Sequence, residues 1–479
     1  MGSLSASRRV TAVLAAATAL TAGGTAAAAA CQPGAAGRPV HPASGVRSTG
    51  AGHPASGRPA AATAADWTTY HYSASRAGVY PRAVPPTGRL IAGWKVTLDG
   101  AVYAEPLVLG GTVIVATEHD TVYGIRNGAV VWRRHLGTPV PRSSLPCGNI
   151  DPLGITGTPV YNAGNGLVYV VTHTASPTVS ERHTLVAVDP RTGARRGSRV
   201  IDPAGSQPHF QQQRGALTIA DGRIWVPFGG LAGDCGPYHG YLVGSAPSLT
   251  GGLTTYQTQS DREGAIWTPP GATVDPAGHL YVSVGNGSAT QRPWDGSDSV
   301  LELSAAAKVI DYFAPSRWDI DNANDRDLGS QGPALVGNYV FIAGKSGTAY
   351  TLRSGALGHI GGQASSSNLC TSFGGTAVSG STVYVPCTDG VRAVSVGSSG
   401  AMQTRWHTSL SVNGSPVSGG GALFVVDSAN SELAELDAAT GQVRAQVSIG
   451  SVSRFATPAL TPRYVVVGTV SGVEVFRFG

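Results

Sequence analysis

A sequence repeat of short apolar runs separated by turns occurs eight times between Ala101 and Gly479. Each copy opens with a small residue beside Pro or Ala, as in Thr158-Pro159-Val160 and Thr457-Pro458-Ala459. The copies start near residues 105, 158, 215, 271, 332, 375, 415 and 457. Repeats on the order of 50 residues built from short strands are typical of β-propellers, in which each copy forms one four-stranded blade. The sequence therefore predicts an all-β propeller.

The ends of the repeat array predict how the ring closes. The last copy, from Thr457 to Phe478, contains only three apolar runs. The segment from Leu90 to Leu98, which carries Trp94, precedes the first complete copy and is expected to add the missing fourth strand. Closure of this kind pairs strand edges that an open array would expose. We expect eight blades in one domain spanning residues 66–479, with seven as the alternative because the third and fourth copies are irregular.

Composition limits the classes of partner. The chain has 66 Gly and 31 Pro, and only 13% of its residues are charged, as expected for many tight turns between short strands. The net charge of +5 is spread along the chain, with neither a basic stripe nor an interleaved aromatic platform. We therefore expect no nucleic-acid partner. Because a closed propeller is self-sufficient, we also expect a monomer.

The N-terminus predicts export. Arg8 and Arg9 precede a short apolar run and a series of small residues ending at Ala30, so residues 1–30 are predicted to be a signal peptide. The apolar run is too short for a membrane-spanning helix. Residues 31–65 are rich in Gly, Ala, Pro and Ser and are expected to form a disordered tether. The mature protein is therefore predicted to be extracytoplasmic.

The five cysteines divide into one and four. Cys31 directly follows the predicted signal, in a weak version of the bacterial lipoprotein box. Lipid attachment at Cys31 and plain secretion both stay open, and a lipid would be the only predicted membrane contact. An exported chain can keep disulfides. We predict a Cys370–Cys387 staple and a Cys147–Cys235 bridge, because no two cysteines have the short spacing of a zinc site.

The middle of the chain, from Gln211 to Arg353, departs from the repeat and gains polar and aromatic residues. Propeller loops converge at one mouth of the central axis, where a concave ligand site is the expected location of function. Candidate pocket residues in this part are Arg214, Asp234, Tyr238 and His239. A hydrogen-bonded structural role is the alternative for the lone His239.

The repeat resembles the pyrroloquinoline-quinone (PQQ) type of propeller repeat. The resemblance rests on the small-Pro-apolar openings, on turns such as Asp189-Pro190-Arg191-Thr192-Gly193, and on tryptophans at the fourth-strand position, which are Trp94, Trp132 and Trp406. Gly154-Ile155-Thr156-Gly157-Thr158-Pro159, Tyr238-His239-Gly240 and Gly344-Lys345 further resemble a group of secreted PQQ-repeat proteins of undefined activity. This group implies a fold and an exported location without implying a reaction.

The stretch from Trp267 through Gly285-Asn286-Gly287-Ser288 to Trp294 is similar to PQQ-dependent alcohol dehydrogenases. The resemblance implies that PQQ stacks on Trp267, that Asn286 ligates Ca²⁺ and that Lys345 hydrogen-bonds the quinone. It also implies that Asp319, in the pair Trp318-Asp319, is the general base. A quinone requires an aromatic face, a hard cation with oxygen ligands and a carboxylate to take the alcohol proton. Oxygen donors are dense after Trp318, so Asp319 and Asp321 are further candidate metal ligands.

The chain also departs from those dehydrogenases. It lacks their adjacent Cys-Cys pair and their Gly-Ala-Glu phrase, and Glu105 and Glu181 are the nearest substitutes for that Ca²⁺-ligating Glu. Blade packing is the alternative role for Trp267, and a turn role is the alternative for Asn286. We therefore expect a propeller that binds a small molecule, a glycan or an envelope protein at its axis. The alternative is a PQQ- and Ca²⁺-dependent oxidoreductase.

Overall fold

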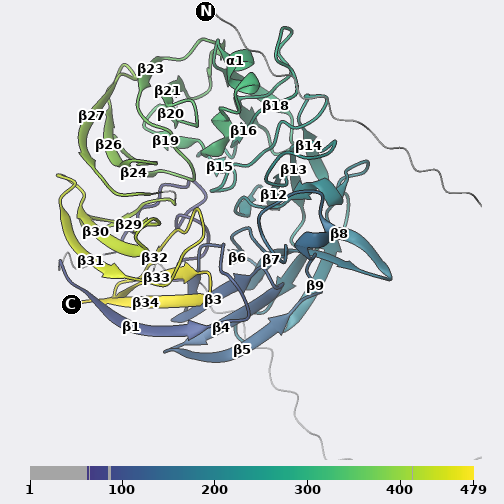
Figure 1. The fold of residues 1–479 in the computed structure, drawn as a ribbon, viewed down its shortest axis with the longest axis vertical. Helices are drawn as coiled ribbons and strands as arrows, with labels where there is room; N and C mark the ends of the chain where they lie inside the picture. The colour runs from purple at the N-terminus through teal and green to yellow at the C-terminus, as the bar shows by residue number, and fades with distance from the viewer. Residues whose placement is uncertain (1–61, 64, 83, 85–87, 413) are drawn as a thin grey trace, which may run out of the picture. The chain divides into compact units, whose positions relative to one another are not determined.

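The computed structural model describes residues 62–63, 65–82, 84, 88–412 and 414–479. Most of the predicted tether, the predicted signal peptide and Cys31 lie outside these residues. Eight sheets are arranged around a central axis (Figure 1), so the eight-bladed prediction is confirmed. The first strand of each blade begins about two residues after the predicted start of its repeat, as at Ala334 and Val417.

The strands of blades 1 and 2 are β2 (Leu107–Leu109), β3 (Thr112–Thr117), β4 (Thr121–Arg126), β5 (Ala129–His135), β6 (Val160–Asn162), β7 (Leu167–Ser176), β8 (Val179–Val188) and β9 (Arg195–Val200). Those of blades 3 and 4 are β10 (Gln211–Gln212), β11 (Thr218–Ala220), β12 (Arg223–Gly230), β13 (Tyr241–Ser245), β14 (Thr254–Gln257), β15 (Thr273–Val274), β16 (Leu280–Val284), β17 (Ser299–Leu303), β18 (Val309–Ala314) and β22 (His359–Ile360). Both blades carry a fifth strand, because β10 pairs with β12 and β22 pairs in parallel with β18. β10 precedes the first strand of the third repeat, and β22 comes from the chain between β21 and β23.

The strands of blades 5 and 6 are β19 (Ala334–Val336), β20 (Tyr339–Ile342), β21 (Thr348–Arg353), β23 (Ser365–Asn368), β24 (Ala377–Ser379), β25 (Thr382–Cys387), β26 (Gly390–Val396) and β27 (Met402–Thr408). Those of blades 7 and 8 are β28 (Val417–Gly419), β29 (Ala422–Asp427), β30 (Glu432–Asp437), β31 (Val443–Ser448), β32 (Ala459–Leu460), β33 (Tyr464–Thr469), β34 (Gly472–Phe478) and β1 (Leu90–Thr97). β1 pairs antiparallel with β34, with Leu90 opposite Phe478 and Thr97 opposite Gly472. The predicted closure by the N-terminal strand is therefore confirmed.

Short helical turns interrupt the strands. They are the 3₁₀ turns η1 (Arg142–Ser144), η2 (Pro208–Phe210) and η3 (Leu328–Ser330), and the α-helix α1 (Trp318–Ala323). Within the described part of the chain, no helix has the length and apolar character needed to cross a membrane.

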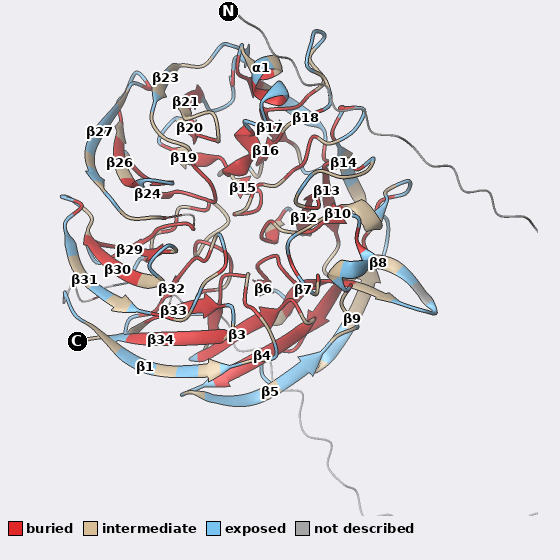
Figure 2. Ribbon diagram, in the orientation of Figure 1, coloured by how far each residue is buried: buried red, intermediate tan, exposed pale blue. Residues whose placement is uncertain are grey.

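The burial of the strands follows their position in each blade (Figure 2). β3 is buried along its whole length, whereas the outer strand β5 is almost entirely exposed. Inner strands are covered on both faces by neighbouring blades, which is why their sequences are continuous apolar runs rather than alternating ones.

The tryptophans of the outer strands join neighbouring blades. Trp132 on β5 donates a hydrogen bond of 3.0 Å from its indole to the carbonyl of Pro190 in blade 2. A Cβ atom at Gly193, where φ is +69°, would lie 2.5 Å from the Trp132 ring. The final glycine of the Asp-x-x-Thr-Gly turn is thus required twice, for its backbone conformation and for the approach of the ring.

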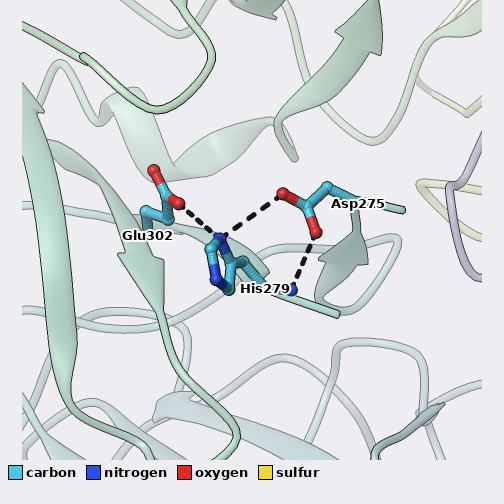
Figure 3. A group of neighbouring side chains, drawn as sticks. All are labelled: Asp275, His279 and Glu302. Atoms are coloured by element: carbon cyan, nitrogen blue, oxygen red, sulfur yellow. Dashed lines mark hydrogen bonds and ion pairs between the residues drawn. The ribbon is translucent and has the colours of Figure 1, made fainter. Parts of the chain in front are cut away.

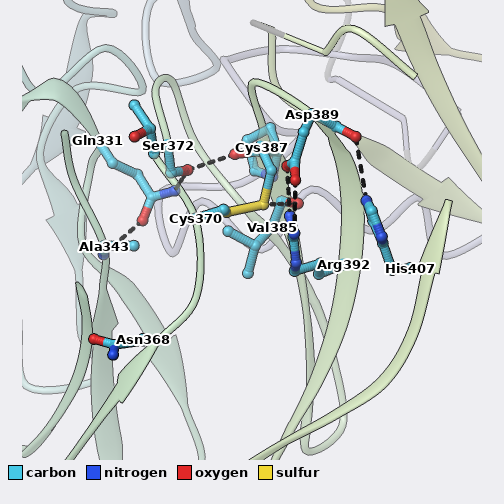
Figure 4. The surroundings of a disulfide bond; sticks show 12 residues. Gln331, Ala343, Asn368, Cys370, Ser372, Val385, Cys387, Asp389, Arg392 and His407 are labelled. Atoms are coloured by element: carbon cyan, nitrogen blue, oxygen red, sulfur yellow. Dashed lines mark hydrogen bonds and ion pairs between the residues drawn. A yellow bond between two sulfur atoms is a disulfide. The ribbon is translucent and has the colours of Figure 1, made fainter. Parts of the chain in front are cut away.

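Both predicted disulfides are present. Cys147–Cys235 joins two long loops of different blades, and Cys370–Cys387 joins the entry of blade 6 to the end of β25 (Figure 4). Next to the second bridge, the Ser372 hydroxyl donates to the Pro386 carbonyl at 2.5 Å, and Gln331 accepts from the Ala343 N–H at 2.8 Å. The bridge therefore lies in a hydrogen-bonded region between blades 5 and 6.

A segment that precedes β1, from Asp66 to Tyr80, crosses one end of the axis. Its backbone forms hydrogen bonds to the innermost strands of several blades, with partners at Val108, Tyr161, Val274, Val378 and Ser418. These strands would otherwise leave N–H and C=O groups unpaired at the centre of the ring. The segment therefore seals one axial end, an arrangement that the repeat pattern did not predict.

Candidate functional site

Loops from blades 3, 4 and 5 gather polar side chains into one cluster. Asp234 and Tyr238 lie between β12 and β13, and Trp267 lies between β14 and β15. Asn286 follows β16, and Lys345 lies between β20 and β21. The segment between α1 and η3 adds two further aspartates.

Lys345 and Asn286 meet through those aspartates. The Lys345 ammonium lies 2.7 Å from Oδ1 of Asp325 and forms a closer ion pair with Oδ2 of Asp327. The backbone N–H of Asn286 donates to Asp327 at 2.7 Å, and its side-chain amide donates to Asp325 at 2.9 Å. The structure therefore brings together the two residues that the sequence assigned to the metal and to the quinone.

Trp267 lies against glycines beside this network. A Cβ atom at Gly229 would lie 2.7 Å from the Trp267 ring, and one at Gly285 would lie 3.2 Å from the ring and 2.5 Å from Asp327. Any larger residue at Gly285 would therefore displace the indole or the carboxylate. The ring is half-buried, which leaves part of it open to a ligand.

The cluster carries more acidic than basic groups. The pKa of Asp234 is raised to about 6, mainly by burial and with contributions from Asp327 and Glu263, although the Tyr238 hydroxyl donates to it at 2.6 Å. Burial also raises the pKa of Asp327, against the opposing effect of Lys345. Asp298 is fully buried, and burial together with the Asp327 charge raises its pKa well above the usual range.

Two of these groups have unpaired oxygens. Oδ1 of Asn286 and Oδ2 of Asp298 are buried without a hydrogen-bond partner. A buried acceptor without a donor is costly, and clustered carboxylates favour a positive charge among them. The atoms available as metal ligands are oxygens, which suit a hard cation such as Ca²⁺. The residues present therefore fit a Ca²⁺ ion at this position.

The predicted base and the other predicted metal ligand lie on α1. Asp319 accepts a hydrogen bond of 2.9 Å from the N–H of its neighbour Ile320. Asp321 accepts one of 3.1 Å from Arg317. The contacts to Asn286 and Lys345 come instead from Asp325 and Asp327, because the chain leaves the helix before it reaches the cluster. The sequence identified the acidic run but not which of its members would face the lysine.

The remaining candidates are Arg214, between β10 and β11, and His239, between β12 and β13. The Arg214 guanidinium lies 5.6 Å from the centre of the Tyr103 ring and 5.0 Å from that of Phe455, and burial lowers its pKa to about 10. His239 pairs through its backbone with Glu263, and its Nδ1 is buried without a hydrogen-bond partner.

The two glutamates considered as Ca²⁺ ligands form their contacts with histidines instead. Glu105 accepts a hydrogen bond of 2.8 Å from the N–H of His71, in the segment that seals the axis. Glu181 lies 2.9 Å from both His173 and His209. Glu263 and Asp298 were not recognised in the sequence. Glu263 has the positive φ of 69° that signals a special backbone position, which no sequence pattern revealed.

Comparison with known proteins agrees with the repeat and the fold. The family model of the outer membrane protein assembly factor BamB matches residues 40–227, which is less than half of the chain. The chain folds as a β-propeller, and its first repeats are similar to the PQQ-type repeat of that family model. A curated relative is the polyvinylalcohol dehydrogenase of Sphingopyxis sp., 26% identical over 256 residues that cover 47% of this chain. The matched region spans about a third of that relative, at 34% of its length.

Solved structures of this propeller type share the fold at low identity. The quinohemoprotein alcohol dehydrogenase of Comamonas testosteroni has a TM-score of 0.64 at 16% identity, covering 87% of this chain and 81% of that one. BamB of Moraxella catarrhalis has a TM-score of 0.55 at 18% identity, covering 81% of this chain and 100% of that one. At these identities the likeness concerns the fold, which both a dehydrogenase and an assembly factor use.

Proposed function

We propose that the cluster around Lys345 binds PQQ with a Ca²⁺ ion and that the protein is an exported alcohol-oxidising quinoprotein. The observation that carries this proposal is the buried, unpaired Oδ1 of Asn286, a residue whose N–H and side-chain amide donate to the carboxylates of Asp327 and Asp325. It is supported by the lysine and the half-buried tryptophan beside them, and by the curated dehydrogenase relative. Two disulfides support the extracytoplasmic location.

Each group then has a role. Asn286 and Asp327 would hold the cation, Trp267 would present a ring face to the quinone, and Lys345 would donate to one of its oxygens. The bound quinone supplies two-electron oxidation of the alcohol carbon, with the cation polarising its carbonyl. Asp234 would take the hydroxyl proton, because a carboxyl with a pKa of about 6 is a base near neutral pH. This assignment replaces the predicted base Asp319, which lies on α1.

The test is reconstitution. Purified protein is incubated with PQQ and Ca²⁺ and desalted, and its ultraviolet-visible spectrum is recorded. We expect a retained quinone band in the wild type, and its loss in Lys345→Ala and in Trp267→Ala. Lys308→Ala is the matched control, because Lys308 is an exposed lysine in the turn between β17 and β18. If the wild type retains no band, or if Lys345→Ala and Lys308→Ala retain it equally, the proposal fails.

A second candidate function is the binding of an envelope protein, as a soluble or Cys31-lipidated propeller. It is supported by the match to the assembly-factor family and by the complete coverage of the BamB chain. Crosslinking in intact cells should then recover a defined partner with equal yield from the wild type and from Lys345→Ala. Loss of the crosslink in that variant would assign the partner instead to the cluster of Asn286, Asp325, Asp327 and Lys345, called the axial cluster below.

A further inference from the structure

A second group of potential metal ligands lies in blade 4, apart from the axial cluster (Figure 3). Asp275 and His279 belong to the turn between β15 and β16, and Glu302 lies on β17. Nδ1 of His279 is 2.7 Å from Oε1 of Glu302 and 3.5 Å from Oδ2 of Asp275. The two carboxylates thus converge on one imidazole nitrogen, one from a turn and the other from strand β17.

The turn orients both of its residues. Oδ1 of Asp275 accepts hydrogen bonds from the backbone N–H groups of Ala277 at 2.9 Å and of His279 at 2.8 Å. These bonds hold the carboxylate with its second oxygen toward the imidazole. Backbone support of this kind is what fixes a metal-ligating carboxylate in place. Gly278, with φ of +90°, makes the turn that brings His279 back over the sheet.

Glu302 supplies an independent sign of a missing cation. Its side chain is 2% exposed, and its buried Oε2 has no close hydrogen bond, although the Tyr281 hydroxyl lies near this carboxylate. A buried carboxylate requires compensation by a positive charge and by bonds to its oxygens. A neutral imidazole can donate one proton from Nδ1 to only one of the two carboxylates. The oxygens of the two carboxylates therefore outnumber the hydrogen bonds that this imidazole nitrogen can donate.

We propose that Asp275, His279 and Glu302 form a binding site for a divalent transition-metal ion such as Zn²⁺. One imidazole nitrogen and two carboxylates are ligands that Zn²⁺ accepts, and three protein ligands leave a position for water. The His279 side chain is 37% exposed, which provides a path by which the ion enters. The bound ion would tie the β15–β16 turn to β17, and so stabilise blade 4 beside the axial cluster.

The experiment uses Co²⁺ as a spectroscopic substitute for Zn²⁺ on chelator-treated full-length protein. We expect the wild type to bind one equivalent of Co²⁺ with visible d–d absorption that Zn²⁺ displaces. His279→Gln and Glu302→Gln should each weaken binding about tenfold or more. His359→Gln should not, because His359 lies 3.3 Å from the carboxylate of Asp311, stacks on Tyr312 and is 67% exposed. Asp327→Asn should also leave Co²⁺ binding unchanged, which separates this site from the axial cluster.

Two outcomes would overturn the proposal. One is the absence of Co²⁺ and Zn²⁺ binding by the wild type after dialysis. The other is equal weakening by the His359→Gln control. Should Glu302→Gln prevent folding, His279→Gln decides alone, because its half-exposed side chain tolerates substitution.

Discussion

Arg76 holds the segment that seals the axis, so its removal should destabilise the whole propeller. The residue is 1% exposed. Its guanidinium donates to the carbonyls of Tyr70 at 2.8 Å and Leu217 at 2.9 Å, and to the hydroxyls of Thr69 and Thr218. Burial lowers its pKa to about 10, with Glu105 opposing, so the group stays charged at neutral pH.

In Arg76→Met the aliphatic stem is kept but both carbonyls lose their donors. Hydroxyls can rotate to other partners, whereas each buried unsatisfied carbonyl costs about 1–3 kcal/mol, giving about 4 kcal/mol in total. An unfolding entropy of about 2.1 cal/mol/K per residue over roughly 400 residues converts this into a fall in Tm of about 5 °C.

Calorimetry measures the Tm, and hydrogen exchange locates the effect. The amides of Val378 and Ser418, which donate to carbonyls of the axial segment, should exchange faster in Arg76→Met. Arg477→Met is the matched control, since Arg477 is exposed on β34 and its loss should cost less than about 0.5 kcal/mol. A Tm of Arg76→Met within about 1 °C of the control would refute the reasoning.

Three further outcomes are expected. Gly285→Ala should abolish retention of PQQ while leaving the circular dichroism spectrum unchanged, because its Cβ would lie 2.5 Å from the Asp327 carboxylate; full retention would contradict the assigned site. Burial and the charge of His183 lower the pKa of His173 to about 4 in the folded state, against 6.5 unfolded. The unfolded chain therefore binds the proton more readily, so urea titrations should show stability falling between about pH 6.5 and 4, by up to about 3 kcal/mol, and His173→Gln should flatten that slope. Replacing the Cys147–Cys235 bridge, which spans 88 residues, by two serines should lower the free energy of unfolding by about 4–5 kcal/mol in the chain-entropy model. Denaturant titrations of both proteins under identical conditions measure this difference, and a loss of less than about 1 kcal/mol would contradict the model.

The blades could be predicted because their signals are local. Small-Pro openings such as Thr158-Pro159 precede the first strand of a blade, and glycine turns such as the one ending at Gly193 follow its third strand. Trp132 was placed correctly in an outer strand because it packs on that turn of the next blade. The closing strand was predicted from a count of three runs in the last repeat, and the pairing of four cysteines followed from their spacing.

The axial cluster was predicted only in part. Lys345 and Asn286 stood out as a rare lysine and a Gly-flanked amide, and both lie in it. Asp319 and Asp327 are equivalent in a run of alternating acids, and the choice between them depends on where α1 ends. Asp298 and Glu263 carried no distinguishing pattern, because their importance comes from burial and from neighbours in other blades.

The sequence by itself determined the all-β class, the closing strand and both disulfides and favoured eight blades over seven, since each depends on periodicity, turn residues or spacing along one stretch of chain. Only the tertiary structure decided that Asp66–Tyr80 seals the axis, that Asp325 and Asp327 face Lys345, and that Glu302 meets His279. Those arrangements join residues from different repeats or strands. Their free energy comes from desolvation and from hydrogen bonds that exist only once the blades have closed into a ring.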